Sequence, residues 1–362
     1  MIPGMSALEA AAGRVLESIP SEITRGELSV CLYGIGLLGH WVLPRLKNNG
    51  IKVVRCYDAN PALNGIPVDG VVICDPSNLR TEKPDYMIVT SRHAIKPVST
   101  MLSNIGIPHV SYDAWHVAAD FSTFRQIHDD VLTDERSKEV VRAVLMAMLT
   151  GDTGYCEAVY EKDQYFCLPR FCGSGNEIYV DAGAFVGDSI EKFIWAQNGV
   201  FAKIYGFEPG PRQFDALRTR VDRLKTEWAI SSDGIEVVKA GLGESEAESR
   251  ASAGGPLTGL AIGHSTGARS CAVSTVTLDS FLRGDRITFL KADVEGMEMA
   301  LLRGARSTIQ RHKPKIGISV YHYSADIPVI SLYLRELVPE YKFALRHHSP
   351  LLMETVLYCW TE

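Results

Sequence analysis

The sequence has no long apolar run and no excess of positive charge. None of its apolar runs reaches the roughly 18–20 residues that a membrane-spanning helix needs. The first 20 residues contain Glu9 and Glu17 and lack the basic-then-apolar pattern of a secretory signal. The net charge is −6 and the pI is near 6.0, so nucleic acid is not an expected partner. We therefore expect a cytoplasmic protein without a membrane span.

Cysteine motifs typical of metal or redox sites are also absent. None of the eight cysteines forms a C-x-x-C pair. Cys167 and Cys172 are the closest pair and lie near Cys156, but no fourth ligand for a zinc ion accompanies them. We predict reduced thiols, most of them buried.

The length and the composition favour two domains. A chain of 362 residues is longer than one ordinary domain, and 46% hydrophobic residues suffice for well-buried cores. In both halves, apolar β-branched runs alternate with segments of helical spacing, which is typical of α/β folds. We predict two Rossmann-like domains, at residues 1–117 and 174–362, joined by a helical and aromatic linker at residues 118–173.

The most informative stretch runs from residue 176 to residue 209. A short apolar run ends at Asp181 and is followed by a turn that contains Gly183 and Gly187. A second apolar run ends at Glu208. In a doubly wound sheet, an acid at the tip of the second strand is placed to bind both hydroxyls of a ribose. The stretch therefore predicts a nucleoside site.

The turn after the first strand differs from a dinucleotide fingerprint. Its pattern is D-x-G-x-x-x-G instead of G-x-G-x-x-G, and the carboxylate of Asp181 would repel a pyrophosphate. An acid at this point suits a cationic ligand, such as the ammonium and sulfonium groups of S-adenosylmethionine. The residues themselves thus favour S-adenosylmethionine over a dinucleotide.

Four motifs in the second half resemble those of the FkbM-type methyltransferases. They are, in order, Val180 to Asp188, Phe207-Glu208-Pro209, Thr277-Leu278-Asp279, and Leu290 to Glu298 with Leu302-Arg303-Gly304-Ala305. The resemblance implies an S-adenosylmethionine-dependent methyltransferase that acts on a small molecule, sugar or glycan. The expected reaction is O-methylation of a hydroxyl on a sugar, a glycan or a secondary metabolite.

The second domain would then be a class I methyltransferase domain with a doubly wound sheet and a terminal antiparallel hairpin. The apolar runs predict strands at 178–181, 204–208, 235–239, 287–292 and 315–320, and the hairpin at 341–346 and 355–360. Helical spacing predicts helices at 188–197, 211–227, 297–311 and 328–338. The Gly-rich stretch from Ala251 to Ser270 predicts an irregular loop, either mobile or folded over substrate.

The carboxyl ends of the strands form the ligand crevice of such a sheet, which assigns the cofactor contacts. Together with the family resemblance, this gives a set of residues expected to bind S-adenosylmethionine: Asp181, Gly183, Ala184, Gly187, Asp188, Glu208, Pro209, Gly241 and Asp293.

Three residues are candidates for catalysis. Asp293 ends the fourth strand and would position the cofactor, act as a base or bind a divalent metal. Glu295 would either contact substrate or place charge at the next helix N-terminus, and Glu298 is interpreted as structural. His322 ends the fifth strand and is the best-placed histidine for a general base. Two acids alone specify no metal, so a divalent metal stays open.

The first domain carries a second nucleotide motif. A strand leads into Gly34, Gly36 and Gly39 in the G-x-G-x-x-G pattern, and Asp58 stands at the tip of the next strand. The unit resembles the nucleotide-binding domains attached to sugar-modifying enzymes. It predicts either a nucleotide or nucleotide-sugar pocket or a scaffold that packs on its neighbour.

Two other functions stay open on the sequence. One is an NAD(P)-dependent oxidoreductase that acts through the first motif, and the other is a non-catalytic protein that binds a nucleotide or a glycan. In the linker, the aromatic segment 152–172 predicts a packing layer or a lid over the cofactor. A homodimer through either domain is a further expectation.

Overall fold

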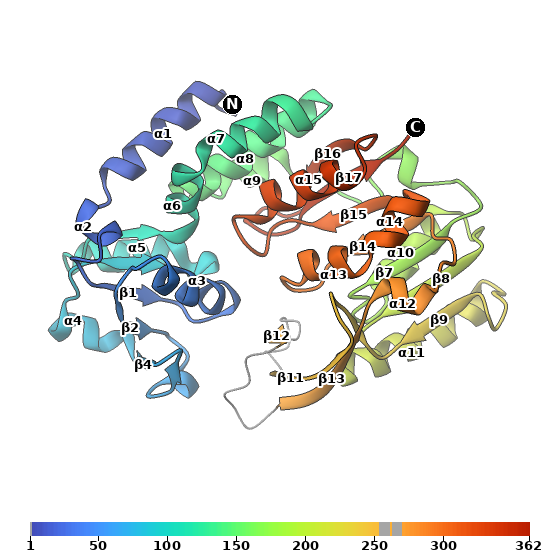
Figure 1. Ribbon diagram of the computed structural model, residues 1–362, viewed down its shortest axis with the longest axis horizontal. Coiled ribbons are helices and arrows are strands. Elements are labelled where there is room, and N and C mark those ends of the chain that lie inside the picture. The colour runs from blue at the N-terminus through green and yellow to red at the C-terminus, as the bar shows by residue number, and fades with distance from the viewer. Residues whose placement is uncertain (1, 253–260, 263–269) are drawn as a thin grey trace.

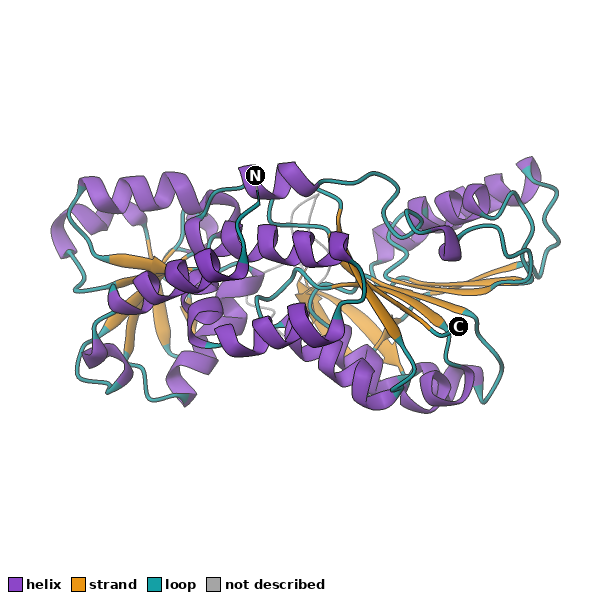
Figure 2. Cartoon of the chain, turned by 90° about the horizontal axis from the view of Figure 1, so that it is seen from above, coloured by secondary structure: helices purple, strands orange, loops and turns teal. Residues whose placement is uncertain are grey.

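The computed structural model describes residues 2–252, 261–262 and 270–362, which form two large sheets in separate parts of the molecule (Figures 1 and 2). One sheet has six strands, the other has seven, and a smaller four-stranded sheet contains β10 to β13. The predicted α/β class with two Rossmann-like sheets is confirmed. Within the ranges described, no helix is both long and apolar enough to cross a membrane.

The N-terminal sheet has the strand order β3-β4-β2-β1-β5-β6. Its strands are β1 (Val30–Tyr33), β2 (Val53–Tyr57), β3 (Pro67–Val68), β4 (Val71–Cys74), β5 (Met87–Val89) and β6 (His109–Ser111). All neighbours pair in parallel except β3 and β4. The strand order reverses direction between β1 and β5, and ligands of open α/β sheets bind at that point.

Helices cover both faces of this sheet. Helix α3 (Leu37–Asn48) packs in the same core as Val30 and Leu32, whereas α5 (Ile95–Asn104) packs with Cys31 and Tyr33. Alternate residues of β1 thus face opposite layers, as the pleat of a strand requires. The short helix α4 (Leu79–Glu82) precedes β5.

A helical layer joins the two large sheets. It consists of α1 (Met5–Glu17), α6 (Tyr112–Ala119), α7 (Phe121–Gln126), a π-helical turn (Ile127–Val131), α8 (Glu135–Thr150) and α9 (Gly154–Val159). The short helix α2 (Ser21–Thr24) packs with the N-terminal sheet through Ile23. Helix α1 packs against α6 and α8 along the upper edge of Figure 1. Leu8 of α1 belongs to the same core as Val140 of α8 and Ile316 of the C-terminal sheet. The first helix therefore contributes to the core of the second half of the chain.

The C-terminal sheet has the order β16-β17-β15-β14-β7-β8-β9. Its strands are β7 (Ile178–Ala182), β8 (Lys203–Phe207), β9 (Ile235–Val238), β14 (Phe289–Ala292), β15 (Lys315–Ser319), β16 (Lys342–His347) and β17 (Thr355–Trp360). Strand β17 is antiparallel to both of its neighbours, and the other pairs are parallel. The predicted terminal hairpin is confirmed, and its second strand lies between β15 and β16.

The two faces of this sheet are covered by different helices. Tyr179 of β7 packs with α10 (Asp188–Ala196) and α11 (Pro211–Glu227). Val180 and Ala182 point to the other face, which is covered by α12 (Leu278–Leu282), α13 (Glu298–Gly304), α14 (Arg306–His312) and α15 (Asp326–Leu337). Helices thus cover both faces of the sheet, and the carboxyl ends of its strands line the cleft described below.

Two parts of the second domain differ from the sequence prediction. The helix predicted at 297–311 is divided into α13 and α14 at Ala305, whose φ of −112° and ψ of 8° interrupt the helix. Asp279 then caps the start of α14 by accepting hydrogen bonds from the backbone N–H groups of Ser307 and Thr308, at 2.9 and 2.8 Å.

The small sheet was also not predicted. It has the order β10-β13-β11-β12, with β10 (Gly241–Leu242), β11 (Ala247–Ser252), β12 (Ala261–Ile262) and β13 (Ser270–Val276). Strands β11 and β12 and the start of β13 fall in or beside the stretch 251–270 that was predicted as an irregular loop. Most of that stretch, residues 253–260 and 263–269, lies outside the described part of the chain.

Candidate active site

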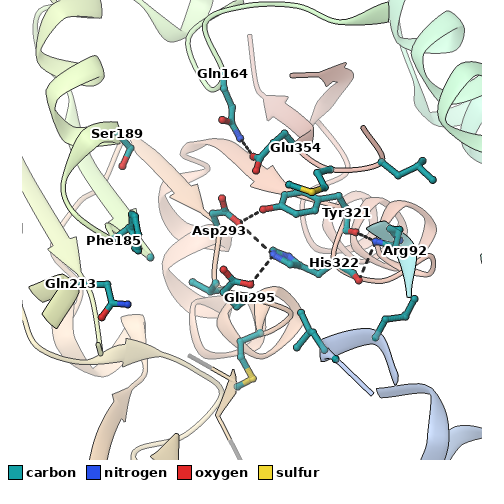
Figure 3. A pocket seen from close by; sticks show the side chains of 18 of the residues that line it. Arg92, Gln164, Phe185, Ser189, Gln213, Asp293, Glu295, Tyr321, His322 and Glu354 are labelled. Carbon is teal, nitrogen blue, oxygen red and sulfur yellow. Dashed lines mark hydrogen bonds and ion pairs between the residues drawn. The ribbon is translucent and has the colours of Figure 1, made fainter. Parts of the chain in front are cut away.

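A cleft of about 620 Å³ is lined by the carboxyl ends of strands from both large sheets (Figure 3). The second domain contributes the predicted residues Gly183, Asp188, Glu208, Pro209, Gly241, Asp293, Glu295 and His322. The first domain contributes Gly34, Gly36 and Asp58. The remaining predicted residues, Asp181, Ala184, Gly187 and Gly39, do not line it. The structure thus brings both predicted nucleotide sites to one cavity.

Asp181 lies behind the wall of the cleft. Its side chain is fully buried, its Oδ1 lies 2.9 Å from Nζ of Lys291, and its Oδ2 accepts a hydrogen bond from Ser189. Lys291 also donates to the carbonyl oxygen of Gly183 at 2.7 Å. Burial works against the charge of Lys291, but the carboxylates of Asp181 and Asp293 outweigh it and raise the pKa of the ammonium group. Asp181 therefore supports the glycine loop through Lys291.

The two glycines of this loop serve chain packing. Gly183 has φ +74°, and a Cβ there would overlap the carbonyl oxygen of Asp293. Gly187 has φ +84°, and a Cβ there would lie 2.9 Å from Leu217 of α11. Both positions need a backbone conformation that glycine adopts at low cost. These glycines mainly allow segments of the chain to pack closely against one another, and Gly183 also lines the cleft.

Glu208 lies at the tip of β8 with two backbone donors. Its Oε2 accepts a hydrogen bond from the N–H of Phe185 at 3.0 Å, and its Oε1 accepts one from Gly210 at 2.7 Å. Burial raises the pKa of Glu208 to about 7 in spite of these donors. A carboxylate offers about four acceptor sites, so two remain for ribose hydroxyls. This donor and acceptor set fits the nucleoside part of S-adenosylmethionine.

Two tyrosines fix the direction of the Asp293 carboxylate. The hydroxyl of Tyr165 donates to Oδ2 at 3.1 Å, and the hydroxyl of Tyr321 donates to Oδ1 at 3.3 Å. Tyr165 also contacts the hydroxyl of Ser319 at 3.0 Å. Phe166 and Phe171 in the same segment pack on Phe289 of β14. The aromatic segment is thus a packing layer that also contributes Gln164 and Tyr165 to the cleft.

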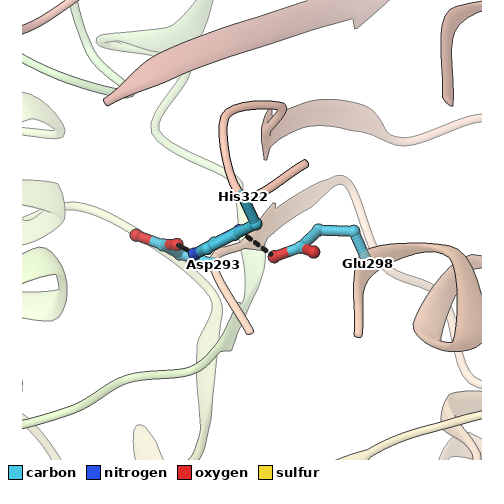
Figure 4. A group of neighbouring side chains, drawn as sticks. All are labelled: Asp293, Glu298 and His322. Atoms are coloured by element: carbon cyan, nitrogen blue, oxygen red, sulfur yellow. Dashed lines mark ion pairs between the residues drawn. The ribbon is translucent and has the colours of Figure 1, made fainter. Parts of the chain in front are cut away.

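His322 lies among three carboxylates. Its Nδ1 is 3.1 Å from Oε1 of Glu298, and its Nε2 is 3.7 Å from Asp293 and 3.6 Å from Glu295 (Figures 3 and 4). Burial alone would lower the pKa of His322, but Glu298, Asp293 and Glu295 together raise it to about 10. The ring is therefore protonated at neutral pH when no other cation is present. A protonated ring cannot act as the general base that the sequence suggested for this histidine.

Glu295 and Glu298 lie on opposite sides of this imidazole. Glu295 has φ +54°, an uncommon conformation for a residue with a side chain that is often found at functional sites. Glu298 is buried, and its Oε1 accepts a hydrogen bond from the N–H of Val294 at 2.9 Å. Among the residues that the structure describes, Asp293, Glu298 and His322 form the one cluster with metal-ligand spacing. The cysteines Cys31, Cys56, Cys74, Cys156, Cys167, Cys172 and Cys359 are all free.

The motif of the first domain has the geometry that its sequence predicts. Gly34 makes the tight turn with φ +99°, and Gly39 allows the helix to approach the carbonyl oxygen of Gly34. Gly36 has nothing within 4 Å of its would-be Cβ and lines the cleft. Asp58 accepts hydrogen bonds from the N–H groups of Ile35 at 2.6 Å and Asn60 at 2.8 Å. Packing within the chain therefore explains two of the three glycines and leaves Gly36 open to a ligand.

Arg92 connects the two halves of the cleft. It forms a bidentate ion pair with Asp113, both distances being 2.7 Å, and donates to the carbonyl oxygens of Tyr321 and His322. Trp41 of α3 stacks on Tyr323, with ring centroids 4.5 Å apart. The loop that carries His322 is thus in direct contact with the first domain.

Sequence reasoning missed several cleft residues: Arg92, Gln164, Tyr165, Phe185, Tyr321 and Glu354. Tyr321 had a usable signal, because it is adjacent to His322 at the end of a predicted strand. Arg92 and Glu354 had none, because they come from distant segments that meet only in the folded chain. His347 and His348, at the end of β16, do not line the cleft.

The seven-stranded sheet and its crevice define a Rossmann-like methyltransferase domain. Residues 181–343 match the family model described as the Methyltransferase FkbM domain, and residues 26–111 match the one described as C2185-like, N-terminal. The chain therefore contains an FkbM methyltransferase domain in its second half and a C2185-like domain in its first half.

A solved structure shares the fold over the whole length. The methyltransferase FkbM from Methylobacillus flagellatus KT is 23% identical, with 99% of each chain covered and a TM-score of 0.61. An rRNA methylase from Streptococcus thermophilus is 15% identical over 52% of this chain and 87% of its own, with a TM-score of 0.33. A Rex-family repressor is 18% identical over 25% and 47%, with a TM-score of 0.22. No curated protein gives a sequence match.

Proposed function

We propose that the protein methylates a hydroxyl on a sugar that is linked to a nucleotide. The observation that carries this proposal is the shared cleft. It is lined by Glu208 of the second domain and by Asp58 of the first, the two acids predicted to bind a ribose. Asp293 and His322 line the same cavity. A volume of about 620 Å³ falls within the usual range for sites that bind small molecules and cofactors.

The donor half of the cleft belongs to the second domain. S-adenosylmethionine supplies a methyl group on a positively charged sulfur, which a hydroxyl oxygen can attack in line. Glu208 would accept hydrogen bonds from its ribose hydroxyls, because two of its acceptor positions are not used by Phe185 and Gly210. Lys291 holds the backbone of Gly183 in place and so keeps the crevice in its binding shape.

The acceptor half belongs to the first domain. Gly36 begins α3, and its open backbone lets a phosphate approach the first N–H groups of that helix. Asp58 would take the ribose of the same nucleotide. A sugar attached to that nucleotide would extend towards Asp293. This arrangement supports an acceptor with a nucleotide handle.

Catalysis by the chain's own residues would rest on positioning. Tyr165 and Tyr321 fix the Asp293 carboxylate, so a hydroxyl that donates to it is held in one orientation. Holding two reactants in a productive geometry can lower a barrier by several kcal/mol. Exclusion of water by the surrounding aromatic side chains strengthens these contacts.

Calorimetric titration of the full chain tests the proposal. Wild type should bind S-adenosylmethionine, and Glu208→Gln should weaken that binding by about tenfold, the usual loss for a hydrogen bond to a charged group. Asp58→Asn should weaken binding of a nucleoside diphosphate sugar and leave S-adenosylmethionine binding unchanged. Binding of NAD(H) alone, unaffected by Glu208→Gln, would overturn the proposal.

A further inference from the structure

The three carboxylates around His322 carry more negative charge than the protonated imidazole can balance. Asp293, Glu295 and Glu298 contribute three carboxylates, and a protonated His322 contributes one positive charge. Three other cations that line the cleft pair with other carboxylates: Lys291 with Asp181, Arg92 with Asp113 and Lys192 with Asp188. The group therefore has a net charge of −2 even when the imidazole is protonated. A divalent cation would offset this charge.

The two ring nitrogens of His322 have different surroundings. Nδ1 faces the buried carboxylate of Glu298 at 3.1 Å. Nε2 faces Asp293 at 3.7 Å and Glu295 at 3.6 Å. The His322 side chain is only 4% exposed, and neither ring nitrogen has a partner with hydrogen-bond geometry among the described residues. A buried nitrogen that is aimed at two carboxylates is placed to bind a cation together with them.

These spacings suit an ion on the Nε2 side of the ring. Oxygen and nitrogen ligands lie about 2.0–2.2 Å from Mg²⁺ or a similar ion, so two ligands of one ion are at most about 4.4 Å apart. The separations of 3.6 and 3.7 Å from Nε2 fall below that limit. Asp293 and His322 already belong to the cluster with metal-ligand spacing, whereas Glu295 does not, so its partly exposed side chain would have to turn towards the ion. On the other side of the ring, Glu298 would accept the Nδ1 proton and orient the imidazole, as carboxylates commonly do behind a metal-binding histidine.

We infer that Asp293, Glu295 and Nε2 of His322 bind a divalent cation of the Mg²⁺ or Mn²⁺ class, with Glu298 as the orienting carboxylate. The cation replaces the proton on Nε2. The inference rests on the proposed methyl transfer for its chemical role, which is to bind the acceptor hydroxyl and lower its pKa. The hydroxyl proton passes to water, the oxygen bonds to the methyl carbon, and the carbon–sulfur bond breaks with its electron pair left on sulfur.

Titration with Mn²⁺, followed by electron paramagnetic resonance of the free ion, tests the site on the full chain. We expect one ion bound per chain and its displacement by Mg²⁺. Glu295→Gln and His322→Gln should each weaken Mn²⁺ binding by at least about tenfold, and Glu298→Gln by about 10–100-fold. Glu336→Gln is the matched control, because it makes the same chemical change on an exposed turn of α15. It should bind like wild type.

Two results would overturn the inference. One is a folded wild-type chain that retains no Mn²⁺. The other is equal Mn²⁺ binding by wild type, Glu295→Gln and Glu336→Gln. Glu295 lies in a partly exposed loop, so its variant should fold even if that of the buried His322 does not.

A parallel measurement in EDTA separates this inference from the proposed function. Binding of S-adenosylmethionine in EDTA, with methyl transfer that needs added Mg²⁺ or Mn²⁺, supports both. Full methyl transfer in EDTA refutes the metal site and leaves the methyltransferase proposal standing. Failure to bind S-adenosylmethionine, with one Mn²⁺ bound per chain, refutes the proposed function and supports the ion site.

Discussion

Lys291 and Asp181 stand opposite each other on the adjacent strands β14 and β7, with Nζ and Oδ1 2.9 Å apart. Both side chains are almost completely buried, at 4% and 0% exposure. A buried ion pair of this kind does not add much stability as a whole, but removal of one partner leaves an uncompensated charge in the core.

The Asp181→Asn variant should therefore be destabilised. We expect the free energy of unfolding to fall by about 3–5 kcal/mol, because Lys291 loses its counter-charge. Urea denaturation measures this change. The double variant Asp181→Asn with Lys291→Met should recover part of the loss. A single variant as stable as wild type would contradict the role of this pair.

S-adenosylmethionine binding should depend on pH through Glu208. The pKa of its carboxyl group is about 7 in the folded chain, so it is mostly protonated at pH 6 and mostly ionised at pH 8. Only the ionised form accepts hydrogen bonds from both ribose hydroxyls, and affinity should rise about tenfold between these pH values. Calorimetry at several pH values checks this. Glu208→Gln serves as the control, because it retains the titration of the ligand but should lose the additional rise.

The glycines of the two domains should tolerate alanine differently. Gly183→Ala places a Cβ against the carbonyl oxygen of Asp293 at a positive φ, so it should fold poorly or not at all. Gly36→Ala meets nothing within 4 Å and has φ −83°, so its melting temperature should stay close to that of wild type. Differential scanning calorimetry of both variants makes the comparison. Strong destabilisation by Gly36→Ala would show that packing also requires this glycine.

Acid should destabilise the fold through His347. Burial lowers the pKa of this histidine to about 4, and its ring nitrogens contact Thr355 at 2.8 Å and the carbonyl oxygen of Leu351 at 2.9 Å. The pKa of this histidine in the unfolded chain is about 6.5. Between pH 6.5 and 4 the ring is therefore mostly protonated in the unfolded chain and mostly neutral in the folded chain. Stability is therefore present above this window and is lost as the pH falls through it.

The contribution of His347 can be isolated by unfolding in urea at two pH values. Between pH 7 and pH 5 this one residue should cost about 2 kcal/mol of unfolding free energy. The His347→Gln variant is less stable at pH 7, but its stability should depend less on pH by that amount. An unchanged pH dependence would assign the acid sensitivity to other groups.

The tyrosines that hold Asp293 should affect turnover more than cofactor binding. Tyr165→Phe and Tyr321→Phe each remove one hydrogen bond to the carboxylate and keep the ring. We expect kcat to fall by roughly tenfold or more in each variant, the value of a hydrogen bond to a charged group, with little change in S-adenosylmethionine affinity. Steady-state kinetics with calorimetry separates the two effects. A loss of cofactor affinity with unchanged kcat would place these tyrosines in the binding of the donor.

Local patterns in the sequence were sufficient for the sheet and for most of the crevice. Asp293 and His322 follow predicted strands, and parallel strands place their carboxyl ends along one edge. The same reasoning placed Asp181 in contact with the ligand, whereas in the structure it lies behind the wall of the cleft and pairs with Lys291. This pairing depends on the register between β7 and β14, which is set only when the chain folds.

Contacts between distant segments could not be predicted. Arg92 reaches the loop of His322 from 229 residues away in the sequence, and no local pattern signals that contact. The small sheet was missed for a different reason. The alternation of Val273 and Thr275 with smaller residues is typical of a strand, but it follows a long Gly-rich stretch that predicts a loop.

The position of β17 between β15 and β16 also bears on how the protein reaches its folded state. Until residues 355–360 insert, β15 presents an unpaired edge, and β16 has no neighbour in the sheet. Unpaired edges are the places where partly folded chains associate wrongly. A shortened chain that ends near Phe343, where the family match ends, would keep that edge permanently open. We would expect such a fragment to aggregate, even though it contains nearly all the residues of the S-adenosylmethionine crevice.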